Sequence, residues 1–250
     1  MKIYIGWDAR EVLAYDVCKY SLESKASIPI DVIPLKHREL RERGLFRRPW
    51  LVESDTGLWR DMIDNKPFST EFSHTRFLVP ALNNYRGWAL FMDCDMISTV
   101  DIRQLFDLCD PRYAVMVVKH NQKVTDTVKM DGQKQEQYHR KNWSSFVLWN
   151  CEHPANRQLT PELVNTMTGA SLHAFAWLSD HHIGHLGNEW NWIAGVSPVL
   201  YQGKRPAVIH YTEGGPWFEN KKEVIYGDIW MEYYTRWQRE TSGGLTIIRG

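Results

Sequence analysis

Apolar residues are arranged in two alternating patterns along this chain. Short apolar runs, in which most side chains could be buried, predict strands. Between them, apolar residues recur every three or four positions, which predicts helices with one buried face. The predicted strands are residues 2–7, 28–35, 88–92, 113–119, 145–149 and 207–211, and the predicted helices are residues 12–22, 69–82, 101–108, 154–167 and 224–239. Strands that alternate with helices predict an α/β fold.

Two long polar segments, residues 36–66 and 120–141, interrupt this pattern. The first predicts a surface excursion, and a loop of that length in a compact domain is usually functional or mobile. Its arginines are Arg38, Arg41, Arg43, Arg47 and Arg48. They could meet a diphosphate or an anionic acceptor, although a solvated charged face is the commoner use of such a run. The second segment is rich in lysine and predicts a lid or an acceptor-contacting loop.

Two acidic residues end the apolar run at residues 88–92, where Asp93 and Asp95 follow directly. Alternate side chains of an extended segment point the same way, so the two carboxylates should lie together. Their repulsion favours a divalent cation with oxygen ligands, and the alternative is a turn in which each Asp accepts backbone hydrogen bonds. Asp8 follows the first predicted strand, so it could face the same crevice at the carboxyl ends of the strands.

Residues 179–191 are dense in polar side chains. His181 and His185 would share one face of a helix, a spacing that suits a metal pair. Gly184 and Gly187 oppose a stable helix there. Ordinary polar packing is therefore the favoured explanation, and a zinc site is the alternative.

Residues 212–218 follow the last predicted strand, which ends near His210, and they contain Gly214 and Gly215. Glycine lets the backbone approach a ligand closely, and successive N–H groups in such a turn can form an anion-binding nest. The alternative is a plain Gly-Gly-Pro turn. The segment is thus a candidate for contact with phosphate groups.

Composition narrows the class of protein. Thirty basic and thirty acidic residues cancel, which removes the simplest argument for a nucleic-acid or membrane-surface partner. The four cysteines form no Cys-x-x-Cys pair, so we expect neither a zinc site nor a disulfide framework, and a cytoplasmic location. The chain begins with a predicted strand rather than a signal peptide, and without a transmembrane segment it should be soluble. Twelve tryptophans and eleven tyrosines suit either core packing or the apolar faces of sugar rings.

In their order, these features resemble glycosyltransferase family 8. The order is a strand followed by Asp8, a helix carrying Arg76, the Asp93-Cys94-Asp95 motif, and a late His210 before Gly-Gly-Pro-Trp217. The resemblance extends over most of the chain. It implies a single domain of the GT-A fold, a Rossmann-like mixed sheet flanked by helices, and the activity of a retaining nucleotide-sugar enzyme.

The resemblance also implies roles for individual residues. Asp93 and Asp95 resemble the family's metal ligands and His210 the third ligand, for Mn²⁺ or, as the alternative, Mg²⁺. Asp180 and His181 fall at the family's Asp-Gln near the reacting centre and are the implied catalytic residues. The substrate-binding residues that it implies are Asp8, Arg76, Cys94, Ser144, Ser145, Asn191, Gly214, Gly215 and Trp217.

The sequence departs from the family pattern at three places. The family's diphosphate-neutralising Lys is missing from residues 212–217, where Lys221, Lys222 or the glycine N–H groups could take its role. Residues 143–145 are Trp-Ser-Ser where the family usually has Asn-Ala-Gly, and His181 replaces Gln. These differences bear on the donor sugar more than on the reaction class.

The leading hypothesis is a metal-dependent glycosyltransferase that moves a hexose from a UDP-sugar to a carbohydrate acceptor with retention. Residues 1–118 would form the nucleotide-binding half and residues 119–250 the half that binds the acceptor and the sugar. One alternative is a metal-dependent nucleotidyltransferase or nucleotide-sugar hydrolase, because an Asp-x-Asp crevice serves both. The other is a non-catalytic carbohydrate-binding protein on the same scaffold, since a fold does not by itself fix a function.

Overall fold

The fold is built on a six-stranded mixed sheet, with strand order β10-β8-β9-β6-β1-β2. The computed structural model describes residues 1–120, 140–198, 200 and 203–242. The strands are β1 (Lys2–Gly6), β2 (Asp31–Leu35), β6 (Trp88–Met92), β8 (Val115–Val117), β9 (Phe146–Asn150) and β10 (Ile183–His185). β1 pairs in parallel with β2 and β6, and β9 runs antiparallel to both β6 and β8. Strands from both predicted halves of the chain therefore share one sheet.

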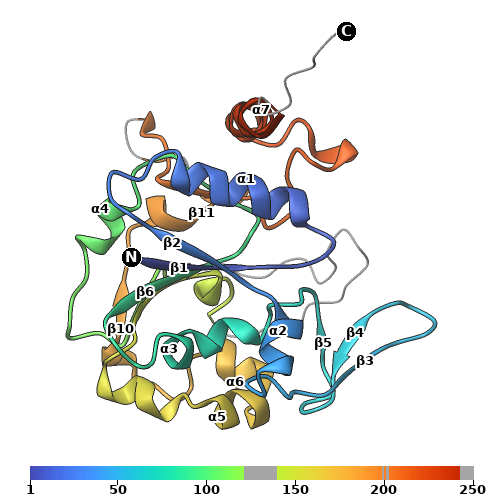
Figure 1. Cartoon of the computed structure of the whole chain (residues 1–250), viewed down its shortest axis with the longest axis vertical. Helices are drawn as coiled ribbons and strands as arrows, with labels where there is room; N and C mark the ends of the chain where they lie inside the picture. The colour runs from blue at the N-terminus through green and yellow to red at the C-terminus, as the bar shows by residue number, and fades with distance from the viewer. Residues whose placement is uncertain (121–139, 199, 201–202, 243–250) are drawn as a thin grey trace, which may run out of the picture.

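Helices cover this sheet on both sides, which explains why its central strands are apolar throughout (Figure 1). α1 (Val12–Glu23) lies over one face, and α7 (Gly227–Ser242) packs outside α1. On the other side lie α3 (Val79–Leu82), α5 (Pro161–Thr166) and α6 (Gly169–His173). In the part of the chain that is described, no helix combines the length and apolarity needed to cross a membrane.

A small second sheet pairs the strand that ends in His210 with the strand that follows Asp93 and Asp95. It contains β7 (Met96–Ser98), β11 (Trp192–Ile193) and β12 (Val208–His210), in the order β11-β12-β7. β12 runs antiparallel to β7, and its register sets His210 opposite Met96. The N–H of Tyr211 also donates to the carbonyl of Asp95 at 2.9 Å. This pairing carries His210 to the acidic turn that ends β6.

The excursion at residues 36–66 is more ordered than its sequence predicts. It contains α2 (His37–Glu42) and two strands, β3 (Trp50–Val52) and β4 (Trp59–Asp61), which form an antiparallel sheet with β5 (Pro67–Phe68). Arg48, predicted to lie on a solvated face, is buried and forms a bidentate ion pair with Asp61, at 2.8 and 2.6 Å. Strands of two or three residues are too short to show a hydrophobic period in the sequence. Arginine is rarely buried unless it is paired, so the sequence alone did not predict the burial of Arg48.

The other predicted elements are found, most of them with bounds that differ by a few residues. Each predicted strand overlaps an observed one, and the predicted helices at 12–22 and 224–239 are α1 and α7. The helix predicted at 69–82 begins only at Thr75, as a 3₁₀ turn (Thr75–Leu78) followed by α3. The helical segment predicted at 101–108 is α4 (Arg103–Phe106), and that at 154–167 is a 3₁₀ turn (Pro154–Gln158) followed by α5. Most of the loop predicted at 120–141 lies outside the described residues.

His181 and His185 do not share a helix face, as Gly184 and Gly187 led us to expect. A 3₁₀ turn covers Asp180–His182, and β10 begins at Ile183 and pairs with β8. Gly184 allows β10 to pack in this position, because a Cβ there would come within 2.7 Å of the ring of Tyr113. The glycine therefore serves close packing of an edge strand.

Candidate active site

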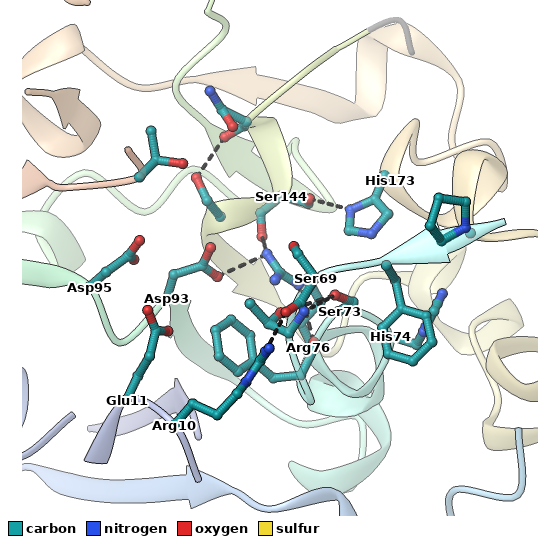
Figure 2. Close-up of a pocket in the computed structure, with 18 of the residues that line it drawn as sticks. Arg10, Glu11, Ser69, Ser73, His74, Arg76, Asp93, Asp95, Ser144 and His173 are labelled. Carbon is teal, nitrogen blue, oxygen red and sulfur yellow. Dashed lines mark hydrogen bonds and ion pairs between the residues drawn. The ribbon is translucent and has the colours of Figure 1, made fainter. Parts of the chain in front are cut away.

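Asp93, Asp95 and His210 form a compact cluster of potential metal ligands. One ligand atom from each residue lies within 4.8 Å of the other two. Among the described residues, this is the one group of three or more His, Cys, Asp or Glu side chains close enough to hold a metal ion. Asp93 and Asp95 occupy the turn between β6 and β7, and Figure 2 shows their carboxylates facing the same cavity. The Asp93 N–H donates to the carbonyl of Ser145 at 2.9 Å. The turn is thus tied to the strand beside it.

The orientation of the His210 ring is fixed by Asn191, which is fully buried. The Asn191 amide nitrogen donates to Ser145 Oγ at 3.0 Å and to the carbonyl of Asn142 at 3.3 Å, so its Oδ1 must be the atom that faces His210. His210 Nδ1 lies 2.9 Å from that oxygen and donates its proton to it. In this tautomer Nε2 carries the lone pair.

The donor atoms of the cluster fit a divalent cation. His210 Nε2 is buried, and within the described part of the chain it forms no hydrogen bond. It lies 3.3 Å from Asp95 Oδ1, so an imidazole lone pair faces a carboxylate oxygen. Two electron-pair donors at that distance repel unless a cation or a proton lies between them. Two carboxylates and one imidazole form a mixed oxygen and nitrogen set that suits first-row divalent ions.

Arg76 balances part of this negative charge. Its Nη1 lies 2.9 Å from Asp93 Oδ1 and donates to the carbonyl of Ser144 at 3.0 Å. The guanidinium lies over the rings of Phe72 and Phe91, which shield it from solvent. The side chain is 6% exposed and lines the cavity, so it holds a fixed positive charge beside the cluster.

Glu11 is a carboxyl that the sequence analysis missed. It precedes α1, lines the cavity and lies beside Asp95 and Asp93 in Figure 2. Burial raises the pKa of Glu11 to about 7, and the charges of Asp95 and Asp8 act in the same direction. The thiol of Cys94 donates to its Oε2 at 3.5 Å. In the sequence, the one sign that Glu11 belongs to the site is its position three residues after Asp8.

Asp8 and Cys94 support the site from beneath rather than lining it. Both are fully buried. Burial opposes ionisation of Asp8, but hydrogen bonds from Arg10 outweigh it and hold the pKa of the carboxyl below its usual value. Burial raises the pKa of the Cys94 thiol well above its usual value. Arg10 and Glu11, rather than Asp8, reach the cavity surface.

The cluster opens into a cavity of about 570 Å³. Of the predicted substrate-binding residues, Arg76, Ser144, Ser145 and Gly214 line it. Asn191 lies behind the wall as the partner of His210, and Trp217 packs against Tyr211, Phe218 and Trp230 beneath α7. Neither Gly215 nor Trp217 is among the lining residues. The same cavity also takes in two histidines that the sequence analysis did not single out, His74 and His173.

Asp180 and His181 lie apart from this cavity. The side chain of Asp180 is 85% exposed and forms an ion pair with Arg140. His181 is exposed and packs against the ring of His182, with ring centroids 4.1 Å apart. The structure does not bring either residue to the metal-ligand cluster, and their catalytic role stays a prediction.

Comparison with known proteins gives a sequence relative and a fold. No family model matches the sequence. Protein CDI of Arabidopsis thaliana is 43% identical over 241 residues, which cover 96% of this chain and 88% of that protein.

Several solved structures that resemble the chain are glycosyltransferases. The apo form of the glycosyltransferase GlyE of Streptococcus pneumoniae TIGR4 superposes with a TM-score of 0.57 at 13% identity, over 97% of this chain and 63% of that one. The bifunctional glycosyltransferase WbbM gives 0.60 at 16% identity, over 97% of this chain and 50% of that one, so the chain spans less than two thirds of either protein. The galactosyltransferase LgtC, solved with donor and acceptor sugar analogues, gives 0.55 at 14% identity, over 100% and 98%. The predicted GT-A fold, of the type found in glycosyltransferase family 8, is confirmed.

Proposed function

The chain belongs to the same family as Protein CDI of Arabidopsis thaliana, and we propose that it is a metal-dependent glycosyltransferase that moves a hexose from a UDP-sugar to a carbohydrate acceptor. The observation that carries this proposal is the cluster of Asp93, Asp95 and His210, which opens into a large cavity of a GT-A fold. Retention of configuration and the UDP group come from the resemblance to family 8. The structural neighbours support glycosyl transfer as the reaction class.

The cation that we propose is Mn²⁺, with Mg²⁺ as the alternative, because a set that includes imidazole suits Mn²⁺ better than harder ions. Asp93, Asp95 and His210 would hold it, and Asn191 keeps the His210 lone pair in place. When bound, such an ion stabilises negative charge that develops on a diphosphate leaving group. Arg76, at a fixed distance from Asp93, adds a permanent positive charge on the same side of the cavity.

Lys221 is our candidate for the missing diphosphate-neutralising lysine. Its Cγ lies 3.5 Å from where a Cβ of Gly214 would be, and Gly214 lines the cavity. Lys222 is exposed and pairs with Glu219 at 2.6 Å, which makes it the weaker candidate. The N–H of Gly214 already donates to the carbonyl of Tyr211 at 2.7 Å. A lysine side chain therefore accounts for diphosphate binding better than a Gly214 nest does.

Other roles in this proposal rest on the resemblance. Asp8 would act in base recognition through Arg10, which it holds by two hydrogen bonds and which lines the cavity. Asp180 and His181 are kept as candidates for positioning the sugar or stabilising the reacting centre. Cys18, Cys94, Cys109 and Cys151 form no disulfide, which supports a reducing compartment such as the cytoplasm.

The test is turnover of UDP-hexoses by protein stripped with EDTA and then given Mn²⁺, with and without a panel of oligosaccharide acceptors. We expect UDP release that requires Mn²⁺ and a glycoside product that appears with an acceptor. Free sugar as the sole product would indicate a hydrolase, and formation of a nucleotide sugar from a sugar phosphate would indicate a nucleotidyltransferase. Binding without UDP release would indicate a carbohydrate-binding protein.

A further inference from the structure

One wall of the cavity carries polar side chains in a series that leads away from the metal-ligand cluster. Arg76 pairs with Asp93 and donates to the carbonyl of Ser144. The Ser144 hydroxyl lies 2.6 Å from Nδ1 of His173, the last residue of α6 (Figure 2). The ring centroid of His74 is 6.4 Å from that of His173. Arg76, His74, Ser144 and His173 come from three separate segments of the chain and all line the cavity, so we call them the polar wall.

The two histidines of the polar wall are uncharged at neutral pH. Burial, together with the charges of Arg76 and Arg48, lowers the pKa of His173 to about 3. Burial and Arg48 hold the pKa of His74 well below its usual value. A neutral imidazole offers one N–H donor and one acceptor nitrogen. Such groups match hydroxyl groups, which both donate and accept, although Nδ1 of His173 is already bonded to the Ser144 hydroxyl.

Gly169 keeps space open at the far end of the polar wall. Its N–H donates to Asp64 Oδ2 at 2.7 Å. A Cβ at this position would lie 3.1 Å from His74 Nε2 and 3.3 Å from Asp64 Oδ2, which is tighter than ordinary packing. Phe68 also lines this end, with its ring 5.2 Å from that of His74. Polar groups beside an aromatic face are the usual features of a sugar site.

We propose that the polar wall is a sugar subsite, in which His173 and His74 bind the hydroxyl groups of an uncharged hexose carried by the donor diphosphate. This inference rests on the proposed function, because the cation and diphosphate at Asp93 and Asp95 set where the sugar begins. The wall starts at Arg76, directly beside Asp93, so a sugar attached to a bound diphosphate can reach it.

The charges at this end of the cavity favour a neutral sugar over a uronic acid. Arg48 is occupied by Asp61, and Arg76 by Asp93. Asp64 and Lys66 add one charge of each sign to the lining. A sugar carboxylate would therefore lose its hydration against two neutral imidazoles, with the charges of Asp64 and Lys66 offsetting each other, which disfavours it.

The experiment is calorimetric titration of UDP, UDP-glucose, UDP-galactose and UDP-glucuronate in Mn²⁺. The quantity compared is the ratio of the Kd for UDP to that for each UDP-sugar. The first variant is His173→Phe, which removes the two ring nitrogens of His173. The second is Gly169→Ala, which narrows the end of the cavity beside His74 without replacing either histidine. The matched control is His185→Phe, at an exposed histidine outside the cavity.

For wild type and the control, we expect the ratio to exceed one for at least one neutral hexose and to be lowest for UDP-glucuronate. In His173→Phe the ratio should fall about tenfold, as expected for one or two lost hydrogen bonds, with the Kd for UDP within about twofold of wild type. Gly169→Ala should lower the ratio in the same direction, and it carries the test if His173→Phe fails to fold. Unchanged ratios in both variants, or tightest binding of UDP-glucuronate, would overturn the sugar subsite while UDP binding leaves the proposed function intact. Failure of UDP itself to bind in Mn²⁺ would overturn both.

Discussion

His210 Nδ1 and Asn191 Oδ1 lie 2.9 Å apart in the interior, and this contact decides which ring nitrogen faces Asp95. Asn191 cannot rotate its amide without placing its oxygen against the carbonyl of Asn142. Its bond to Ser145 extends the same framework to Asp93, whose N–H donates to the Ser145 carbonyl. Two of the three candidate metal ligands are therefore held by one buried side chain and the strand beside it.

Replacement of Asn191 should weaken metal binding without removing a ligand. We expect Asn191→Leu to raise the Kd for Mn²⁺ by about 10- to 100-fold, the usual cost of losing the partner of a ligating histidine. Asn191→Asp keeps an acceptor for the Nδ1 proton and should retain more of the affinity. Titration of the metal-free variants with Mn²⁺, followed by electron paramagnetic resonance, measures this directly. Equal affinities in wild type and Asn191→Leu would contradict the role.

The buried pair of Arg48 and Asp61 should anchor the three-stranded sheet to α5. Arg48 also donates to the carbonyls of Val164 and Met167, at 3.0 and 2.6 Å. Arg48→Met leaves a buried carboxylate without its partner and should lower the free energy of unfolding by about 3–5 kcal/mol. The double variant with Asp61→Leu should recover part of this loss.

Urea denaturation measures both effects. The control is Arg47→Met, because Arg47 is exposed and its pair with Glu162 lies in solvent. That change should cost less than about 1 kcal/mol. An equal loss at Arg47 and Arg48 would refute the anchoring role.

Acid should destabilise the protein through its buried histidines. Burial lowers the pKa of His173 to about 3, and burial with Arg41 and Arg38 lowers that of His37 to about 4, from an ordinary value of 6.5. The unfolded chain binds protons at these positions below pH 6.5 and the folded chain does not. The free energy of unfolding should therefore fall as pH drops from 6.5 toward 4, by up to about 1.4 kcal/mol per pH unit for each histidine.

Urea denaturation at pH 7, 6 and 5 measures this slope. His173→Gln should reduce the slope by up to one histidine's share, whereas His185→Gln, at an exposed position, should leave it unchanged. Glu11, whose pKa burial raises to about 7, acts in the opposite direction over this interval, so the decisive comparison is between wild type and His173→Gln, and equal slopes in the two would contradict the account.

Asp180 gives a test of the mechanism carried over from family 8. If it stabilises the reacting centre, Asp180→Ala should lower kcat by about 100-fold with little change in the Kd for UDP. Its present partner is Arg140 at the surface, so Asp107→Ala, another exposed acidic residue, is a suitable control. Unchanged turnover in Asp180→Ala would remove this residue from the mechanism.

The sheet and the pair of Asp93 and Asp95 could be predicted from the sequence because each has a local signal, whereas His210 was added to the pair only through the resemblance to family 8. The run at residues 88–92 is apolar throughout since β6 is covered on both faces, and Asp93 marks where it surfaces. The ordering of residues 36–66 had no such signal. It depends on the ion pair of Arg48 with Asp61, 13 residues away, and on the bond from Arg48 to the carbonyl of Val164 in α5, 116 residues away.

Within the site, the sequence predicted the members of the Asp93, Asp95 and His210 cluster better than the residues around them. Asn191 was predicted to contact substrate, and its place behind His210 depends on the register of β12 against β7. Glu11, His74 and His173 carry no motif, and tertiary packing alone brings them to the cavity. Glu11 and His173 stand out only in the structure, where burial and charged neighbours shift their pKa values.

The measurement that tests the central claim most directly is calorimetric titration of UDP into wild type with Mn²⁺, into wild type with EDTA, and into Asp95→Asn with Mn²⁺. The account predicts binding in the first case and loss of at least about tenfold in affinity in the other two, because the diphosphate binds through a cation held by Asp95. UDP binding of equal strength in all three would contradict it, since the acidic cluster would then have no part in holding the donor.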